Sequence, residues 1–505
     1  MKNQIKSGAI LGYVNMFANI IVTFFYTPIM INLMGQGEYG LYSLVVSVIA
    51  YLSVLDMGFG NAMIRFISKS QAKKEQNEEH KINGLFLFLY AIIGIITLVV
   101  GFILMQNSDA LFEASLTVEE LEKAKIIMGI LVVTVAVSFP LSIFDSYIMA
   151  CEKFNFLKVL NIIKTVAIPL TMFPMLLWGY KSITMVIVTS VYSIACQIAS
   201  LMYCFKKLKM KIHFKIKEFD KILFKEILAY SFFVFLNIVV DNVFNNTDQV
   251  ILGSVCGTAV VAVYAVAIKF TSMNTTFSTT ISSLFLPKIT KLMEEKDADK
   301  KVSDIFIKVS RIQIYLMTLI LSGFVVYGKA FIRLWVGEEY KDVYYIILLL
   351  IGPALIPLTQ NIGISIIQAK NKHQFRSVVY IIIAALNIGI SIPLASQYQG
   401  IGAAIGTAIA NCLGQILTMN IFYWKVAKID IPKYWRFLLK FIIPIAILAC
   451  INMYIIKDMT FNWMKLGIGV LIYSAIYCII VYLFMNKEEK QYVSRIKNKL
   501  LRKGR

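Results

Sequence analysis

The stretch FANIIVTFFYTPIMINLMG, residues 17–35, decides the fold because a related stretch returns later in the chain. FLNIVV, residues 235–240, matches its first six residues, and the register then holds without a gap until Gly35 meets Gly253. Both stretches open an apolar run of about twenty residues or more, the length that a membrane-spanning helix needs. A membrane helix repeated in this way indicates that part of the chain is duplicated.

A second pair of segments supports the duplication. FPLSIFDSYIMACEKFNF (139–156) aligns with IPLTQNIGISIIQAKNKHQF (356–375) after a slip of two residues, so that Pro140 meets Pro357 and Phe156 meets Phe375. The two pairs occur in the same order and at nearly the same spacing. They therefore predict two copies of one unit rather than a chance similarity.

The composition is that of a polytopic membrane protein. Of the 505 residues, 58% are hydrophobic and only 16% are charged. Taking about twenty apolar residues per span, we expect about fourteen transmembrane helices and an all-α fold. Their expected cores are 8–33, 39–61, 84–106, 124–150, 157–178, 182–205, 227–254, 258–286, 309–334, 343–368, 377–396, 401–424, 438–456 and 465–486.

The basic residues gather in one set of alternate loops. Lysine and arginine number 50 against 29 acidic residues. About 40 of these cations lie at the N-terminus, in alternate loops and in the tail from Lys487, and such loops face the cytoplasm. We therefore predict that both termini are cytoplasmic. This topology explains the positive charge better than nucleic-acid binding does. The three histidines lie in separate loops, so no metal site is expected, and no cofactor is predicted.

The repeat also predicts how the chain is organised. Six helices separate equivalent points, so both copies enter the membrane in the same direction, which makes a parallel repeat. We expect two six-helix bundles around a central cleft, with helices 13 and 14 added outside the repeat. The expected parts are 1–205 (N-lobe), 206–226 (basic linker), 227–424 (C-lobe), 425–486 (helices 13 and 14) and 487–505 (basic cytoplasmic tail).

Polar residues interrupt the span 227–254. At about 100° per residue, Asn237, Asp241, Asn245 and Asp248 lie within a narrow arc of a helix, and valines fill the opposite half. A carboxylate that faces acyl chains costs several kcal/mol or more, so this arc must meet protein or water. We predict that it lines a cavity for substrate or a coupling ion.

The following helix, 258–286, carries Lys269 and Thr276 on one face. Lys269 lies about twelve residues into the helix, at a depth similar to that of Asp241 on the neighbouring helix. In one interpretation Asp241 and Lys269 form a structural pair, because buried charges usually pair. In the other, the pair lines a hydrated cleft, and the aspartates offer a site for Na⁺ or H⁺ coupling.

Two further cations are candidates for the same cavity. Lys164 lies roughly nine residues into the span 157–178, where it could line the cavity or reach the cytoplasmic interface along its flexible stem. Arg65 lies toward the cytoplasmic end of the span 39–61, within SVLDMGFGNAMIRF (53–66). Topological charge is the competing explanation for Arg65. Gly58 and Gly60 would allow a bend or close packing in that segment.

The chain resembles a known transporter family along nearly its whole length. FANIIVTFFYTPIMINLMGQGEYGLYSL, LDMGFGNAMIRF and DQVILG followed by VYAVAIKF look like the polysaccharide transport family, the oligosaccharide-lipid flippases of O-antigen and capsule pathways, within the multidrug/oligosaccharidyl-lipid/polysaccharide exporter superfamily. The resemblance implies a multi-pass protein of the bacterial inner membrane. It also implies alternating-access movement of an undecaprenyl-diphosphate-linked oligosaccharide to the outer leaflet, in the same pathway as glycosyltransferases and a polysaccharide polymerase.

Three other functions compete with the flippase. A peptidoglycan-precursor (lipid II) flippase of the same superfamily shares the helix count, whereas ion-coupled multidrug exporters usually stop at twelve helices. A polytopic glycosyltransferase is the enzyme alternative, but we expect such an enzyme to have a large external domain, and no external loop here exceeds about twenty residues. No P-loop, HExxH or GxSxG motif occurs either, so we predict a transporter and not an enzyme.

Overall fold

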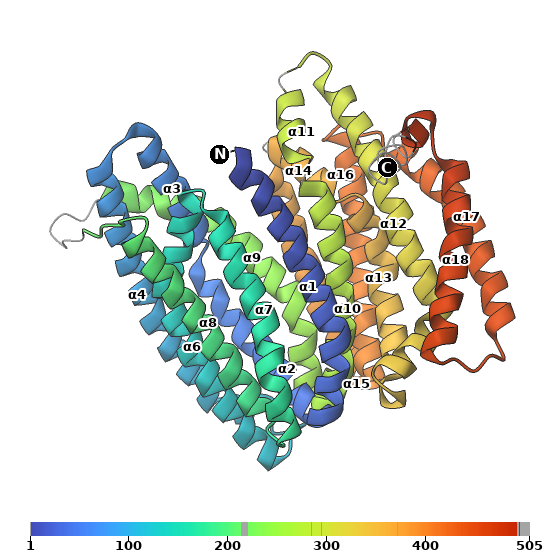
Figure 1. Cartoon of the computed structure of the whole chain (residues 1–505), viewed down its shortest axis with the longest axis horizontal. Coiled ribbons are helices and arrows are strands. Elements are labelled where there is room, and N and C mark those ends of the chain that lie inside the picture. Colours follow the sequence, from blue (N-terminus) through green and yellow to red (C-terminus); the bar gives the residue numbers. More distant parts are fainter. Residues whose placement is uncertain are drawn as a thin grey trace, which may run out of the picture. The chain divides into compact units, whose positions relative to one another are not determined.

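Helices make up most of the described part of the chain. The computed structural model describes residues 2–213, 221–283, 285–293, 295–370, 372–491 and 494 (Figure 1). Over these residues the secondary structure contains helices and no strand, and thirteen helices are long and apolar enough to cross a membrane. The predicted all-α polytopic fold is therefore confirmed.

The fourteenth predicted span is contained in one of these thirteen helices. The helix Gln374–Lys425 has 52 residues, which at about 1.5 Å per residue is more than twice the thickness of a bilayer core. Its backbone breaks at Gln399, where φ is 53° and ψ is −134°. The break falls in the predicted turn 397–400, so the long helix comprises the two expected spans on either side of it.

Cα packing divides the chain into two compact units. Unit 1 comprises Met1–Lys269 and Ala384–Ala403, and unit 2 comprises Phe270–Ile383 and Ala404–Arg505. The predicted lobes, with boundaries at 205, 227 and 424, and the cleft between them stay predictions. Within the expected linker and tail, residues 214–220, 492–493 and 495–505 lie outside the described residues.

Unit 1 is built mainly from the N-terminal helices. Figure 1 shows α4, α6 and α8 side by side, and α1 packs on α7. A capping box between Thr117 and Glu120 starts α6, because each side chain accepts a backbone N–H at the first turn. The elements are α1 (Lys2–Met34), α2 (Gln36–Ala50), η1 (Tyr51–Asp56), α3 (Phe59–Lys73), α4 (Gln76–Gln106), α5 (Ser108–Phe112), α6 (Val118–Ala150), α7 (Phe154–Leu177), α8 (Ser182–Lys206), α9 (Lys221–Val255), the first half of α10 (Thr258–Ser283) and residues 384–403 of α15 (His373–Asn411).

Unit 2 contains the second half of α10 and most of the C-terminal helices. Its core joins α12, α17 and α18 through buried aromatic side chains, among them Tyr315, Phe441 and Tyr477. The two helices without a repeat partner thus pack into this unit. The elements are α11 (Leu286–Leu292), α12 (Ala298–Trp335), η3 (Glu338–Tyr340), α13 (Val343–Thr359), α14 (Ile362–Ala369), the remaining parts of α15 (His373–Asn411), the π-helix η4 (Cys412–Thr418), α16 (Met419–Lys425), α17 (Ile431–Ile456) and α18 (Trp463–Phe484).

The span predicted at 39–61 is not one straight helix. Between η1 and α3, Met57 has φ 50° and Gly58 has φ 74°, which is left-handed backbone that most side chains disfavour. A Cβ atom at Gly58 would lie 2.5 Å from Cγ1 of Val234 on α9, so only glycine fits there. The bend and close packing predicted for this segment are confirmed, and they set α3 against α9.

Close backbone contacts also set α2 against α9 and α10. A Cβ atom at Gly40 on α2 would lie 1.8 Å from the carbonyl oxygen of Thr258, and one at Gly253 on α9 would lie 2.2 Å from Cδ1 of Leu44. Neither position admits a larger residue without movement of the backbone or of a packed side chain. These two contacts bring α2 to the pair of helices that carries the candidate site.

Candidate functional site

A short turn within unit 1 joins α9 to the first half of α10. Only Cys256 and Gly257 separate Val255 from Thr258, and the left-handed Gly257 (φ 87°) donates its N–H to the carbonyl of Leu252. The similar depth and the direct pairing predicted for Asp241 and Lys269 both stay predictions.

The polar arc of α9 has a buried part close to the turn. Thr247, Asp248 and Gln249 are buried, with Asp248 only 3% exposed. The hydroxyl of Tyr264 on α10 donates to Oδ2 of Asp248, and Thr247 shares a hydrogen bond with the hydroxyl of Tyr51. A buried carboxylate needs such donors. The structure therefore packs Asp248 inside unit 1.

From about one to two turns before Asp248, the same arc of α9 is exposed. Asp241 and Asn245 are exposed, and the amide of Asn245 donates to the carbonyl oxygen of Asp241 at 2.7 Å. Asn242 and Asn246 are half-buried beside them and are joined by an amide–amide hydrogen bond of 3.2 Å. An amide carries two N–H donors and an acceptor oxygen, so one internal bond leaves capacity for a ligand. The backbone of Asn237 belongs to α9, but its side chain lies outside the described residues.

Lys269 lies over an aromatic ring. Its Nζ atom is 5.4 Å from the ring centroid of Tyr39, which is fully buried on α2. An aromatic face attracts an ammonium group without neutralising its charge. Sequence reasoning missed Tyr39, although it follows the Gly35 break by only four residues and lies next to Gly40.

Thr276 lies farther along α10, in the part that belongs to unit 2. Its side chain is exposed, and its hydroxyl donates to the carbonyl oxygen of Ser272 at 2.9 Å. The opposite face of this half of α10 is buried: Ser278 donates to the carbonyl of Leu358, and the amide of Gln313 donates to Ser282. The serine and threonine residues thus separate into an exposed face and an interhelical face.

Lys164 and Arg65 have neighbours other than those described for Asp241 and Lys269. Lys164 is half-buried on α7 and interacts electrostatically with Asp145 on α6. Arg65 is exposed on α3, and its guanidinium lies 4.6 Å from the ring centroid of Tyr230 on α9. The two residues therefore have different neighbours, and the cavity role predicted for both is not tested by this geometry.

Arg65 does line a cavity within unit 1. This cavity has a volume of about 460 Å³ where α3 meets α9. Two basic side chains and one acidic side chain share it with two aromatic rings, and the excess of positive charge is suited to an anionic group. The lining residues are Arg65, Phe66, Lys69, Glu226, Ala229 and Tyr230. Lys69 and Tyr230 were missed from the sequence because they are far apart in the chain.

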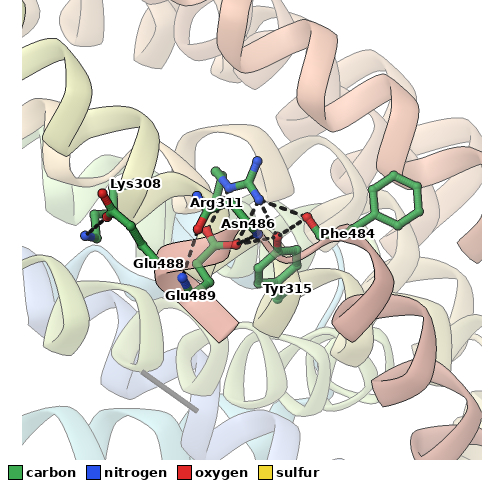
Figure 2. A network of polar contacts seen from close by, with 7 residues as sticks. All are labelled: Lys308, Arg311, Tyr315, Phe484, Asn486, Glu488 and Glu489. Carbon is green, nitrogen blue, oxygen red and sulfur yellow. Dashed lines mark hydrogen bonds and ion pairs between the residues drawn. The ribbon is translucent and has the colours of Figure 1, made fainter. Parts of the chain in front are cut away.

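A second cluster of charges lies in unit 2 at the start of the tail (Figure 2). The guanidinium of Arg311 donates to both oxygens of Glu489, at 2.8 and 2.9 Å, and also to the hydroxyl of Tyr315 and the carbonyl of Phe484. Asn486 donates its backbone N–H to the same carboxylate at 2.8 Å. Arg311 on α12 therefore fastens the end of α18 and the residues that follow it.

This closed cluster changes the acidity of its carboxylate. Burial alone would raise the pKa of Glu489, but the hydrogen bonds from Arg311 and Asn486 outweigh it, so the pKa lies below its ordinary value. Glu489 is therefore ionised at neutral pH.

The structure offers no metal site in its described part. Among these residues, no group of three or more His, Cys, Asp or Glu side chains could hold a metal ion.

Comparison with known sequences identifies a family match. The family model described as "Polysaccharide biosynthesis protein" matches residues 5–293, which is more than half of the chain. A curated relative, the uncharacterized membrane protein EpsK of Bacillus subtilis (strain 168), is 20% identical over 498 residues, and the alignment covers 94% of each chain.

Comparison with solved structures agrees on the fold. The lipid II flippase MurJ in an inward closed conformation is 18% identical, with a TM-score of 0.69 over 96% of this chain and 98% of that one. An inward-facing multidrug transporter of the MATE family, in the MOP superfamily, is 13% identical, with a TM-score of 0.68 over 85% of this chain and 99% of that one. At these identities the similarity is one of fold.

Proposed function

Because the chain belongs to the polysaccharide biosynthesis protein family, we propose that this multi-pass membrane transporter flips an undecaprenyl-diphosphate-linked oligosaccharide from the inner to the outer leaflet of the bacterial cell membrane. Such a substrate carries a diphosphate and many hydroxyl groups. The observation that carries the proposal is that α10 carries a cation and the neighbouring α9 carries exposed polar groups. Lys269 offers the cation, and the exposed part of the α9 arc offers amides and a carboxylate.

Each chemistry matches one part of the substrate. An ammonium group attracts phosphate strongly where water is partly excluded. Amide groups both donate to and accept from hydroxyls, as a sugar requires, so Asn245 is suited to the oligosaccharide. Asp241 would repel a diphosphate, and we assign it to sugar hydroxyls or to a coupling cation, Na⁺ or H⁺. Arg65 in its cavity provides a second cation for the diphosphate.

The helix count favours a flippase over a multidrug exporter. The MATE transporter is covered almost completely but matches only 85% of this chain, the share expected when two added helices have no equivalent. MurJ matches 96% of this chain. The second candidate function is therefore flipping of the peptidoglycan precursor lipid II, because MurJ is a lipid II flippase. Rocking of the two predicted lobes in alternating access is part of the proposal.

Reconstitution separates these functions. The purified full-length protein is placed in liposomes that contain either an undecaprenyl-diphosphate-linked oligosaccharide or lipid II, and exposure of the sugar on the other leaflet is followed with a lectin or a membrane-impermeant enzyme. We expect faster exposure of the oligosaccharide lipid than in protein-free liposomes, with little effect on lipid II. Faster exposure of lipid II alone would establish the second candidate, and no acceleration of either would refute a flippase. Repeating the assay with a Na⁺ or a pH gradient tests the coupling ion.

A further inference from the structure

Unit 2 contains a basic cavity that the proposed transport does not use. It has a volume of about 670 Å³ and lies where α12 begins, α16 ends and α17 begins. Lysine is its commonest lining residue. The lining residues are Lys300, Ser303, Asp304, Trp424, Lys425, Lys428, Ile429, Asp430 and Lys433.

The charges of this cavity do not cancel. Four ammonium groups face two carboxylates. Lys433 lies 3.6 Å from Asp304, and the carboxylate of Asp430 caps α17 by accepting the backbone N–H of Lys433. In the described part of the chain the structure gives Lys300, Lys425 and Lys428 no ion pair. The cavity thus has an excess of positive charge that is suited to a phosphate group.

The loop 426–430, which carries Lys428 and follows Lys425 at the end of α16, is firmly held. The Nζ atoms of Lys370 and Lys372 donate to the carbonyl oxygens of Ala427 and Val426, at 2.6 and 3.2 Å. On the other side, the backbone N–H of Asp430 donates to the hydroxyl of Ser303 at 2.9 Å. These bonds fix the floor of the cavity and do not involve the side chains of Lys425 and Lys428.

Lys428 has an unusual backbone conformation in this loop. Its φ is +58°, in the left-handed region that a residue with a Cβ atom disfavours. It closes α16, because the N–H of Ile429 donates to the carbonyl oxygen of Tyr423 at 2.9 Å, the bond that commonly ends a helix at a left-handed residue. The conformation therefore helps to fix the backbone of this loop, and the excess of charge and the position of the cavity carry the inference.

The position of the cavity points to a lipid as the source of the phosphate. Its residues come from the ends of three candidate spans, Ala298–Trp335, Gln374–Lys425 and Ile431–Ile456. Trp424, which is 53% exposed, lies among them, and tryptophan is enriched at the level of lipid headgroups. Basic pockets at the cytoplasmic ends of membrane helices are known to bind anionic headgroups. We propose that this cavity binds the phosphate of an anionic phospholipid headgroup.

Titration of short-chain lipids tests the proposal with the intact protein. Purified full-length protein in a nonionic detergent is titrated with dioctanoyl phosphatidylglycerol, dioctanoyl phosphatidylcholine or inorganic phosphate, and binding is followed by microscale thermophoresis. We expect saturable binding of phosphatidylglycerol and much weaker binding of the other two. Equal affinity for inorganic phosphate would overturn the lipid as the ligand, and equal affinity for phosphatidylcholine would overturn recognition by charge.

Substitution of the three unpaired lysines locates the site. Each lysine near an anionic group contributes about fivefold in affinity, so Lys300→Gln/Lys425→Gln/Lys428→Gln should bind phosphatidylglycerol about a hundredfold more weakly. The control Lys206→Gln/Lys207→Gln/Lys209→Gln removes the same charge from exposed positions of unit 1 and should bind within twofold of the parent. Thermal unfolding checks that both proteins are folded, and the single variants Lys425→Gln and Lys428→Gln repeat the test with less change. Unaltered affinity in the cavity variants, or an equal loss in the control, would overturn the proposal.

Discussion

The Arg311–Glu489 cluster of unit 2 and the α9–α10 polar face of unit 1 each contain a charge carried by a candidate membrane-spanning helix, but they are built differently. In the cluster, one guanidinium meets a carboxylate, a hydroxyl and a carbonyl, and the side chains of Arg311 and Glu489 are only 16% and 8% exposed. On the polar face, Asp241 and Asn245 are exposed and Lys269 lies over a ring.

This difference separates structural charge from charge that can meet a ligand. A buried ion pair whose donors and acceptors are all satisfied is costly to break and has no capacity for another partner. An exposed amide, or an ammonium attracted by a ring, retains capacity for hydrogen bonding and for attraction of an anion. Breaking the first region should therefore affect stability, whereas breaking the second should affect transport.

The largest effect is expected in the closed cluster. Glu489→Ala leaves Arg311 buried without its carboxylate, and we expect a loss of about 3–5 kcal/mol in stability, because an uncompensated buried charge remains. Thermal unfolding of the purified protein and its level in the membrane measure this loss. The neighbouring pair Lys308–Glu488 is 40% and 70% exposed, so Glu488→Ala should cost at most about 1 kcal/mol. Equal losses in the two variants would show that the cluster is not specially stabilising.

A smaller loss of stability is expected beside the turn of α9 and α10. Tyr264→Phe removes one donor to the buried Asp248 and should cost about 1–3 kcal/mol, the usual range for loss of a hydrogen bond to a buried charged group. Combining it with Asp248→Leu should return part of that stability, because the buried carboxylate is removed as well. If the single variant unfolds at the parental temperature, Asp248 has another sufficient donor.

The chemistry of the exposed face is tested by the ring beneath Lys269. Tyr39→Leu removes the cation–π contact, which is worth about 1 kcal/mol, so we expect the half-saturating substrate concentration in the liposome assay to rise about fivefold. Tyr39→Phe keeps the ring and should behave like the parent, which makes it the matched control. The ring does not position Lys269 if both variants transport alike.

The smallest effect is a pH dependence of the closed cluster. The pKa of Glu489 is lowered in the folded protein, so the stability that it contributes is present above its unfolded pKa, about 4.3, and is lost as pH falls through the folded pKa. Unfolding midpoints of the parent and of Glu489→Gln should differ by a constant amount from pH 7 to pH 5 and converge below about pH 4. A difference that already narrows between pH 7 and pH 6 would contradict the lowered pKa.

Most of the fold was predictable from the sequence because spans follow hydropathy. The break at Gln399 lies in the turn expected at 397–400, and the bend at Gly58 lies where two glycines occur close together. The partners of individual charges were not predictable. Glu489 follows Arg311 by 178 positions, and Tyr39 lies on a helix far from Lys269 in sequence. Periodicity places a residue on a face of its own helix, but which face of which other helix it meets depends on tertiary packing.

For the same reason, the sequence pattern of α9 predicts one continuous polar surface. Its period groups Asp241, Asn245 and Asp248 together, whereas the structure buries Asp248 and exposes the other two. The close approach of α2 at Gly253 and of α10 at Tyr264 creates that difference. No signal within α9 itself marks the boundary between the buried and the exposed part.

The contrast between structural and ligand-binding charge is tested most directly by the double variant Lys269→Met/Asp241→Asn, with both single variants beside it. Flipping of the undecaprenyl-diphosphate-linked oligosaccharide in liposomes is measured together with the thermal unfolding midpoint of each protein. We predict a double variant that unfolds near the parental temperature and transports at least about tenfold more slowly, because a charge-assisted contact with the diphosphate is lost. A double variant with parental stability and parental transport, made from two unstable single variants, would show that Asp241 and Lys269 are a structural pair outside the substrate site.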